Sequence, residues 1–206
     1  MEYLADTIRI ARIREETTYG GRRVKLQARL GRARLTIQID VGVGDAVTPG
    51  PEWVELPPML DLPVAKLRAY RPETSIAEKL ETIARRGLLN SRLKDYFDIL
   101  VLSTHVSFDL RSLAGAIRNT FERRETQIPT TLPEGLTQAY VKEPGRTLQW
   151  RSFLKKSGVA DVPGELEFVV ESIAMFLEPA IRAARVEETE QLRWPCGGPR
   201  QRQKEA

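Results

Sequence analysis

Cysteine and histidine are almost absent from this chain of 206 residues, which has one of each, Cys196 and His105. A single cysteine excludes a disulfide within the chain and leaves too few thiolate ligands for a structural zinc site. A lone histidine without a recognisable serine or cysteine partner gives no sign of a hydrolase triad. A Gly-rich P-loop motif is also missing. These absences argue against disulfide scaffolds, zinc proteins, triad hydrolases and P-loop NTPases.

Long apolar runs are missing as well. The longest, such as Ile99–Ser103, fall far short of a bilayer span. The N-terminal segment is charged from Glu2 and lacks the apolar region of a secretory signal. We therefore expect a cytoplasmic protein with no membrane contact. Hydrophobic residues make up 41% and charged residues 29%, and the net charge of +4 permits contact with nucleotides or RNA.

The first third of the sequence predicts one helix and a β-hairpin. Residues 1–16 place apolar side chains at helical spacing, and Tyr19–Gly21 ends that pattern. Two alternating runs follow, over residues 24–30 and 33–43, with Gly31 and Arg32 between them. Such alternation across a two-residue turn is a strong hairpin signal.

The rest of the chain predicts a proline-rich loop and then helices. The loop covers residues 44–73 and includes a short strand near 64–70. A capping box at Ser75–Glu78 begins the first helix and Gly87 ends it. Further helices are expected at 91–103, from Asp109 on, and at 136–141, 145–156 and 164–185, the last broken near Pro179. The predicted class is α+β, with a sheet region at 1–72, a helical region at 73–186 and a polar, disordered or loosely docked tail at 187–206.

Two single residues are candidates for phosphate or metal chemistry. Asp40 lies near the end of the second strand on its polar face, where a carboxylate can hold a divalent cation or act as a base. It can equally be a solvated residue before a turn. Lys79 lies at the border of an apolar helical stripe, so its stem can pack while its ammonium reaches a phosphate. The alternative is an ordinary surface lysine.

The densest group of charges is Lys94, Asp95 and Asp98, with Arg92 just before it. On a helix Asp95 and Asp98 share a face, and Lys94 and Asp98 are spaced for an ion pair. Acids beside bases can bind a metal–nucleotide complex. The alternative is an exposed salt bridge at the start of a helix, with residues such as Tyr96 and Phe97 facing the core.

Taken together, three strings resemble the AbiEii-type nucleotidyltransferase toxins, also called MenT-like toxins. The strings are Ile39-Asp40-Val-Gly-Val-Gly-Asp45, Glu73-Thr-Ser-Ile-Ala-Glu-Lys79-Leu80 and Asn90-Ser-Arg-Leu-Lys-Asp95-Tyr-Phe-Asp98. Their order and spacing match the family's strand and two helices. The likeness covers residues 19–126 and continues to the tail around Trp194.

The resemblance implies transfer of a nucleotide from an NTP, with Mg²⁺, to an RNA such as tRNA or to a protein, and a cognate antitoxin as partner. It implies catalytic roles for Asp40, Lys79 and Asp95, nucleotide binding by Lys79, Lys94 and Asp98, and metal binding by Asp40. It also implies that the strand, with Asp40, and the two helices, with Lys79 and Asp95, form one cleft.

The sequence departs from the family before Asp40. The family's Gly-rich phosphate turn and its D-x-D metal strand do not occur there. We therefore expect a truncated or degenerate member with weak or no transfer activity, in which the edge of the 24–30 strand is unpaired. The alternative function is a non-catalytic basic module that binds RNA or the antitoxin.

Overall fold

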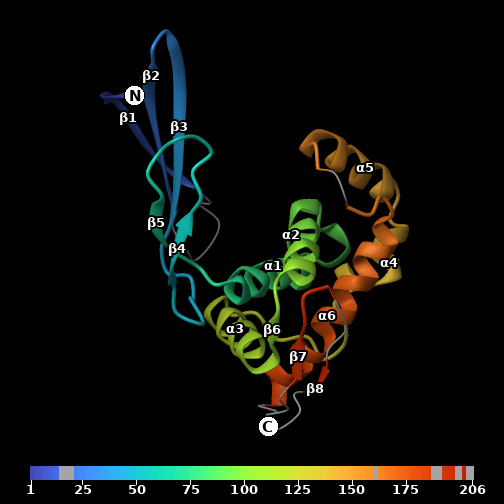
Figure 1. Cartoon of the computed structure of the whole chain (residues 1–206). Helices are drawn as coiled ribbons and strands as arrows, with labels where there is room; N and C mark the ends of the chain where they lie inside the picture. Colours follow the sequence, from blue (N-terminus) through green and yellow to red (C-terminus); the bar gives the residue numbers. More distant parts are fainter. Residues whose placement is uncertain (14–20, 160–161, 187–191, 198–200, 203–206) are drawn as a thin grey trace. The chain divides into compact units, whose positions relative to one another are not determined.

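The computed structural model describes residues 1–13, 21–159, 162–186, 192–197 and 201–202. It divides into two compact units, residues 1–45 and residues 46–206, and each is described by itself. The first is an antiparallel sheet and the second is mainly helical, with the elements labelled in Figure 1. The α+β class is therefore confirmed.

The first unit is a three-stranded antiparallel sheet in the order β1-β2-β3. Its strands are β1 (Glu2–Ile13), β2 (Gly21–Leu30) and β3 (Ala33–Gly42). Gly31 supplies the positive φ, +58°, that the tight turn between β2 and β3 needs. The predicted hairpin is confirmed. β2 pairs on both sides, so the prediction of an unpaired edge on this strand is wrong.

The prediction of an N-terminal helix is also wrong, because the described part of that segment is β1. The segment is rich in β-branched and aromatic residues, such as Tyr3, Thr7, Ile8 and Ile10, which favour a pleated surface over a helix. Pairing along β2, with one irregularity between Leu4 and Arg9, decides the outcome. Local apolar spacing carries no information about such a distant partner.

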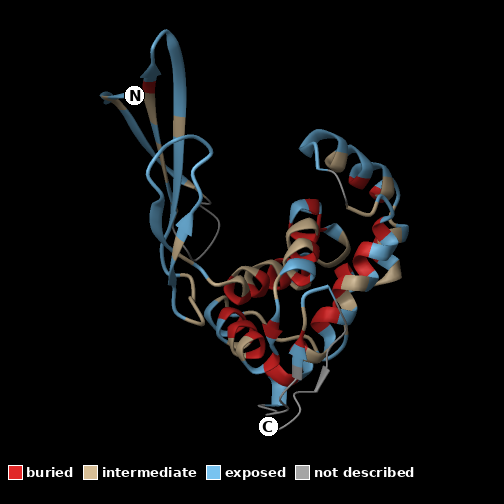
Figure 2. Cartoon of the chain, in the orientation of Figure 1, coloured by how far each residue is buried: buried red, intermediate tan, exposed pale blue. Residues whose placement is uncertain are grey.

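The sheet separates apolar from polar side chains but buries few of either. One face carries the cross-strand pairs Val24–Ile39 and Leu26–Ile37, and the other carries Arg23–Asp40. Within this unit only Ala28 is a buried hydrophobic residue among those described. Figure 2 shows the strands mostly exposed, with the buried residues concentrated in the helices.

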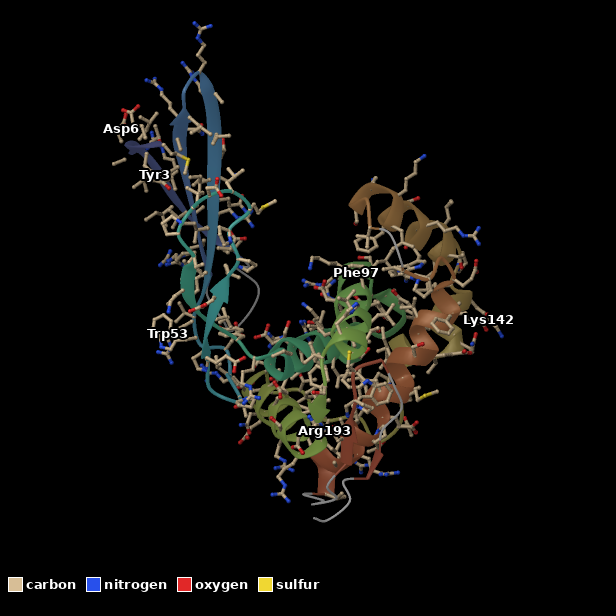
Figure 3. All side chains as sticks on the ribbon, viewed as in Figure 1. Tyr3, Asp6, Trp53, Phe97, Lys142 and Arg193 are labelled. Atoms are coloured by element: carbon tan, nitrogen blue, oxygen red, sulfur yellow. The ribbon has the colours of Figure 1, made fainter. Side chains whose placement is uncertain are left out.

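The second unit opens with a two-stranded hairpin and a proline-rich connection. The hairpin pairs β4 (Glu52–Leu56) with β5 (Ala65–Ala69). The predicted strand near 64–70 is confirmed, whereas its partner β4 was not foreseen. Several apolar side chains here face solvent, including Trp53, which Figure 3 labels on β4.

Six α-helices form the body of this unit within the described residues: α1 (Pro72–Arg86), α2 (Leu93–His105), α3 (Leu110–Arg123), α4 (Gln138–Lys142), α5 (Arg146–Ser157) and α6 (Leu166–Val186). Short 3-10 turns, η1 (Gly87–Leu89) and η2 (Glu134–Leu136), connect them. α1 begins at Pro72 after Arg71, so the predicted capping box at Ser75 is wrong. Proline suits a first helical position because it has no N–H to lose there. The predicted end at Gly87 is confirmed.

A single apolar core joins these helices, and α6 runs through it without a break at Pro179. Proline removes one helical hydrogen bond. Residues on both sides of Pro179 are buried in the core, and this burial offsets the loss. They are Phe176, Leu177, Ala180 and Ile181. The predicted break is therefore wrong. None of the helices in the described residues is long and apolar enough to cross a membrane.

Part of the predicted tail is ordered. A small sheet pairs β6 (Phe108–Asp109) with β7 (Leu192–Trp194), and β7 with β8 (Gln201–Arg202). Trp194 is buried against Phe176 and donates its indole N–H to Ser103 O at 2.8 Å. The prediction of a loose tail is wrong for residues 192–194, and residues 187–191, 198–200 and 203–206 lie outside the described residues.

Candidate functional site

Two lysines from different helices meet one carboxylate oxygen in the helical unit. Asp98 Oδ2 on α2 lies 3.1 Å from Lys79 Nζ on α1 and 2.6 Å from Lys94 Nζ. Lys79 and Asp98 are largely shielded, with side chains 19% and 18% exposed, whereas Lys94 is 71% exposed. The predicted ion pair of Lys94 and Asp98 is confirmed. The convergence of the two ammonium groups marks a place where a single anionic oxygen is bound twice.

Asp95 lies one turn before Asp98 and is engaged by Arg92. Arg92 Nε and Nη2 donate to the two carboxylate oxygens of Asp95 at 2.6 and 3.2 Å. Asp95 is 2% exposed, whereas the Arg92 side chain is 44% exposed. The hydrogen bond to Asp95 raises the pKa of Arg92 above its usual value, although burial opposes it. Asp95 therefore anchors an exposed guanidinium at the start of α2, and the charge of Asp98 also raises its pKa.

A buried clamp fixes the loop that leads into α2. The carbonyl oxygen of Asn90 accepts hydrogen bonds from Tyr140 Oη at 2.8 Å and from Arg146 Nη1 at 2.9 Å. Arg146 also donates to Leu88 O at 2.8 Å and lies over the Tyr140 ring at 4.4 Å. Burial raises the pKa of Tyr140, so its hydroxyl stays protonated as a donor at neutral pH. The clamp sets the position from which α2 presents Lys94, Asp95 and Asp98.

Tyr96 extends the clamp into the core. Its ring stacks on Tyr140 with centroids 4.8 Å apart, and its hydroxyl donates to Gly135 O at 2.8 Å. Tyr96 faces the core as predicted and is buried, and Phe97 packs partly buried against the same core; Leu100 is buried with them. Trp150 is fully buried as well.

A second ionic network lies on α1 next to Lys79. The buried carboxylate of Glu81 accepts hydrogen bonds from Arg85 at 2.8 Å, Arg124 at 2.8 Å and Thr126 at 3.0 Å. Burial alone would raise the pKa of Glu81, but Arg124 and Arg85 outweigh it, and the pKa lies below its ordinary value. Arg124 also lies 3.7 Å from Glu78, which precedes Lys79.

Asp40 belongs to the other unit and is held by a cation of its own. Arg23 on β2 donates twice to its carboxylate, with both distances 2.8 Å. The hydrogen bonds from Arg23 lower the pKa of Asp40, with burial a smaller opposing effect. Asp40 lies on the polar face of its strand as predicted, and Thr36 and Gln38 share that face. The cleft predicted for Asp40, Lys79 and Asp95 stays a prediction.

The acids of the candidate set do not make a divalent-metal site as they stand. Asp40 is paired with Arg23, Asp95 with Arg92, and Asp98 with two lysines. Across the described ranges, no group of three or more His, Cys, Asp or Glu side chains is placed to hold a metal ion. Divalent cations prefer several carboxylate oxygens that no cation already occupies. The Mg²⁺ prediction therefore stays a prediction.

Sequence reasoning missed three contributors to this site. They lie far from α1 and α2 in the sequence, and each makes a hydrogen bond described above: Arg124, Tyr140 and Arg146. Arg146 is 8% exposed, although a charged residue at the start of a helix usually faces solvent. Only its tertiary partners, two backbone carbonyls, could have revealed this.

One comparison with known proteins gives a match. The family model described as "Nucleotidyl transferase AbiEii toxin, Type IV TA system" matches residues 2–184. No curated protein and no solved structure matches the chain significantly. Because the match covers most of the chain, the chain belongs to the AbiEii nucleotidyltransferase toxin family, and the resemblance found from its motifs is confirmed.

Proposed function

We propose that this AbiEii family chain binds the triphosphate of an NTP at Lys79, Lys94 and Arg92 and passes a nucleotide to an RNA acceptor. The observation that carries the proposal is the pair of ammonium groups on one oxygen of Asp98. Two cations from separate helices that meet at one anionic oxygen are suited to a phosphate oxygen in the same place. When the phosphate binds, Asp98 gives up its ion pairs with Lys79 and Lys94 to a phosphate oxygen.

The chemistry is an in-line displacement at the α-phosphorus. An acceptor hydroxyl forms a new P–O bond as the bond to the leaving pyrophosphate breaks. The hydroxyl proton passes to solvent, because Asp95 is buried under Arg92. Lys79 and Lys94 stabilise charge on the phosphoryl oxygens, and the exposed side of Arg92 is available to a further oxygen. A family antitoxin is the expected protein partner.

Titration calorimetry with sodium tripolyphosphate tests the binding step. Replacing Lys79 by Met removes one charge-assisted contact, so we expect affinity to fall about tenfold. Lys66→Met is the matched control, because Lys66 also pairs with one acid, Glu55, but lies on the β4–β5 hairpin. Unchanged affinity in Lys79→Met, or equal losses in both variants, would contradict the proposal.

A second candidate is a non-catalytic module that binds RNA or the antitoxin. The observation that favours it is that Asp40, Asp95 and Asp98 are each already paired with a cation. Incubation with labelled NTPs and RNA separates the two functions, because only the enzyme leaves a covalent label on the RNA.

A further inference from the structure

We propose that the polar face of the β1–β3 sheet is the surface that holds the phosphate backbone of the RNA acceptor. This face consists of the side chains that alternate with the apolar set described above. The inference rests on the proposed function only for the identity of the acceptor. It concerns binding by residues outside the Lys79–Asp98 cluster.

The register of the strands places like charges directly opposite each other on this face. Arg29 on β2 faces Arg34 on β3, and Arg9 on β1 faces Lys25 on β2. All four are exposed. Like charges in direct cross-strand register destabilise a sheet, and an anion bound between them removes that repulsion. Two such pairs on one face therefore favour an anionic partner.

The acids on this face compensate little of the charge. Among the residues that the cross-strand register places on this face, they are Glu2, opposite Arg29, and Asp40. Asp40 is already used by Arg23, which brings a fifth basic side chain to the face. Five bases against two acids leave an extended positive surface rather than a point site. An extended positive surface suits a polyanion such as a nucleic-acid backbone.

The composition of the face also predicts how RNA is read. Its uncharged members are small, aliphatic or amide side chains, among them Gln27, Thr36 and Gln38, and the described residues there include no aromatic ring. Base recognition on open sheets depends on aromatic stacking. Contacts from this face therefore go to phosphates, and binding is strongly salt-dependent and indifferent to base identity.

Fluorescence anisotropy with a labelled RNA hairpin, over a series of salt concentrations, tests the proposal. The sheet variant is Lys25→Gln/Arg29→Gln/Arg34→Gln in the full chain. Its matched control is Lys142→Gln/Lys155→Gln/Lys156→Gln, which removes three exposed positive charges from the helical unit. We expect the sheet variant to lose at least about tenfold in affinity and to lower the salt slope by about 2 to 3. The control should change affinity less than about twofold.

Three results would overturn the proposal. They are no binding by the native chain, equal losses in the two triple variants, and equally tight binding of polyglutamate, which would indicate an acidic protein surface instead. Failure here leaves tripolyphosphate binding at Lys79 untouched, so the two proposals fail separately.

Arg34→Glu should change two measured quantities in opposite directions, the stability of the sheet and its affinity for RNA. The new carboxylate faces Arg29 across the strands, so hydrogen exchange of the β2 and β3 amides should slow while RNA affinity falls. Slower exchange with unchanged RNA affinity, or loss of the sheet's protection together with affinity, would contradict a binding role for this face.

Discussion

Glu81 shows how a buried charge is tolerated in the helical unit. Its carboxylate has no exposed surface and is bonded to Arg85, Arg124 and Thr126. Breaking such a pair by removing one partner is far more costly than the net value of the pair, because it leaves a charge without compensation. Arg124 is 18% exposed, so it depends on this acid more than the half-exposed Arg85 does.

Glu81→Gln should destabilise the protein by about 1–3 kcal/mol at neutral pH. The pKa of Glu81 is lowered on folding, so its charge stabilises the fold above its ordinary pKa of 4.5, and this contribution is lost as pH falls through the folded-state pKa. The difference between variant and native chain should shrink below pH 4.5. Urea unfolding at several pH values measures this. A gap that stays constant into acid would show that shape, not charge, is what Glu81 provides.

The sequence was informative about single residues wherever a partner lies within one helical turn. The pairing of Lys94 with Asp98 follows from spacing alone. That Lys79 shares Asp98 does not, because the contact joins two helices. The burial of Asp95 beneath Arg92 was equally hidden, since a charged residue in the first turn of a helix is usually solvated.

Whether a helix or strand could be predicted from the sequence depended on how far along the chain its deciding contact lies. The β2–β3 hairpin and the end of α1 at Gly87 are set by nearby residues, and both were predicted. β1 depends on pairing with β2, which overrode its helical apolar spacing. The unbroken α6 depends on core burial, which overrode the effect of Pro179. The clamp on α2 is of the second kind, because α4 and α5 supply it.

The two stacked tyrosines allow a test of the clamp. Tyr140→Phe loses the hydrogen bond to Asn90 O, and Tyr96→Phe loses the one to Gly135 O, while each ring remains. Each change should cost about 1 kcal/mol of stability. Tyr140→Phe should weaken tripolyphosphate binding more than Tyr96→Phe does, because Tyr140 bonds to the Asn90 loop that leads into α2, whereas the Tyr96 bond joins α2 to the core side at Gly135. Calorimetry on both variants, well below their melting temperatures, separates a positioning effect on the binding site from a loss of stability. Equal affinity losses in the two variants would argue against a positioning role for Tyr140.

At the scale of the whole molecule, the two units are stabilised differently. The helical unit has a continuous core, whereas the described sheet exposes most of its apolar face, including Ile39 and Val41 at 50% and 43%. Exposed apolar surface on this scale is typical of an interaction surface.

The family could be read from the motifs because it depends on short strings. The geometry among Asp40, Lys79 and Asp95 could not, because it depends on how two separate units are joined.

We expect the 206-residue chain to label RNA weakly with labelled NTPs in Mg²⁺ buffer. The carboxylate that the family resemblance assigns to the metal, Asp40, is held by both ends of a guanidinium. Each 1.36 kcal/mol of lost transition-state stabilisation costs about tenfold in rate. Arg23→Gln releases Asp40 and should raise the labelling rate at saturating RNA, where a weaker hold of the sheet on RNA has no effect.

Arg22→Gln is the matched control, because it removes the same charge from the adjacent residue on the opposite face of the sheet. Labelling that rises in Arg23→Gln but not in Arg22→Gln would assign the limit to the occupied carboxylate. Labelling that stays low in both would favour the non-catalytic module, since freeing Asp40 then restores nothing. Robust labelling by the native chain would contradict the prediction, because a carboxylate other than Asp40 must then serve the reaction.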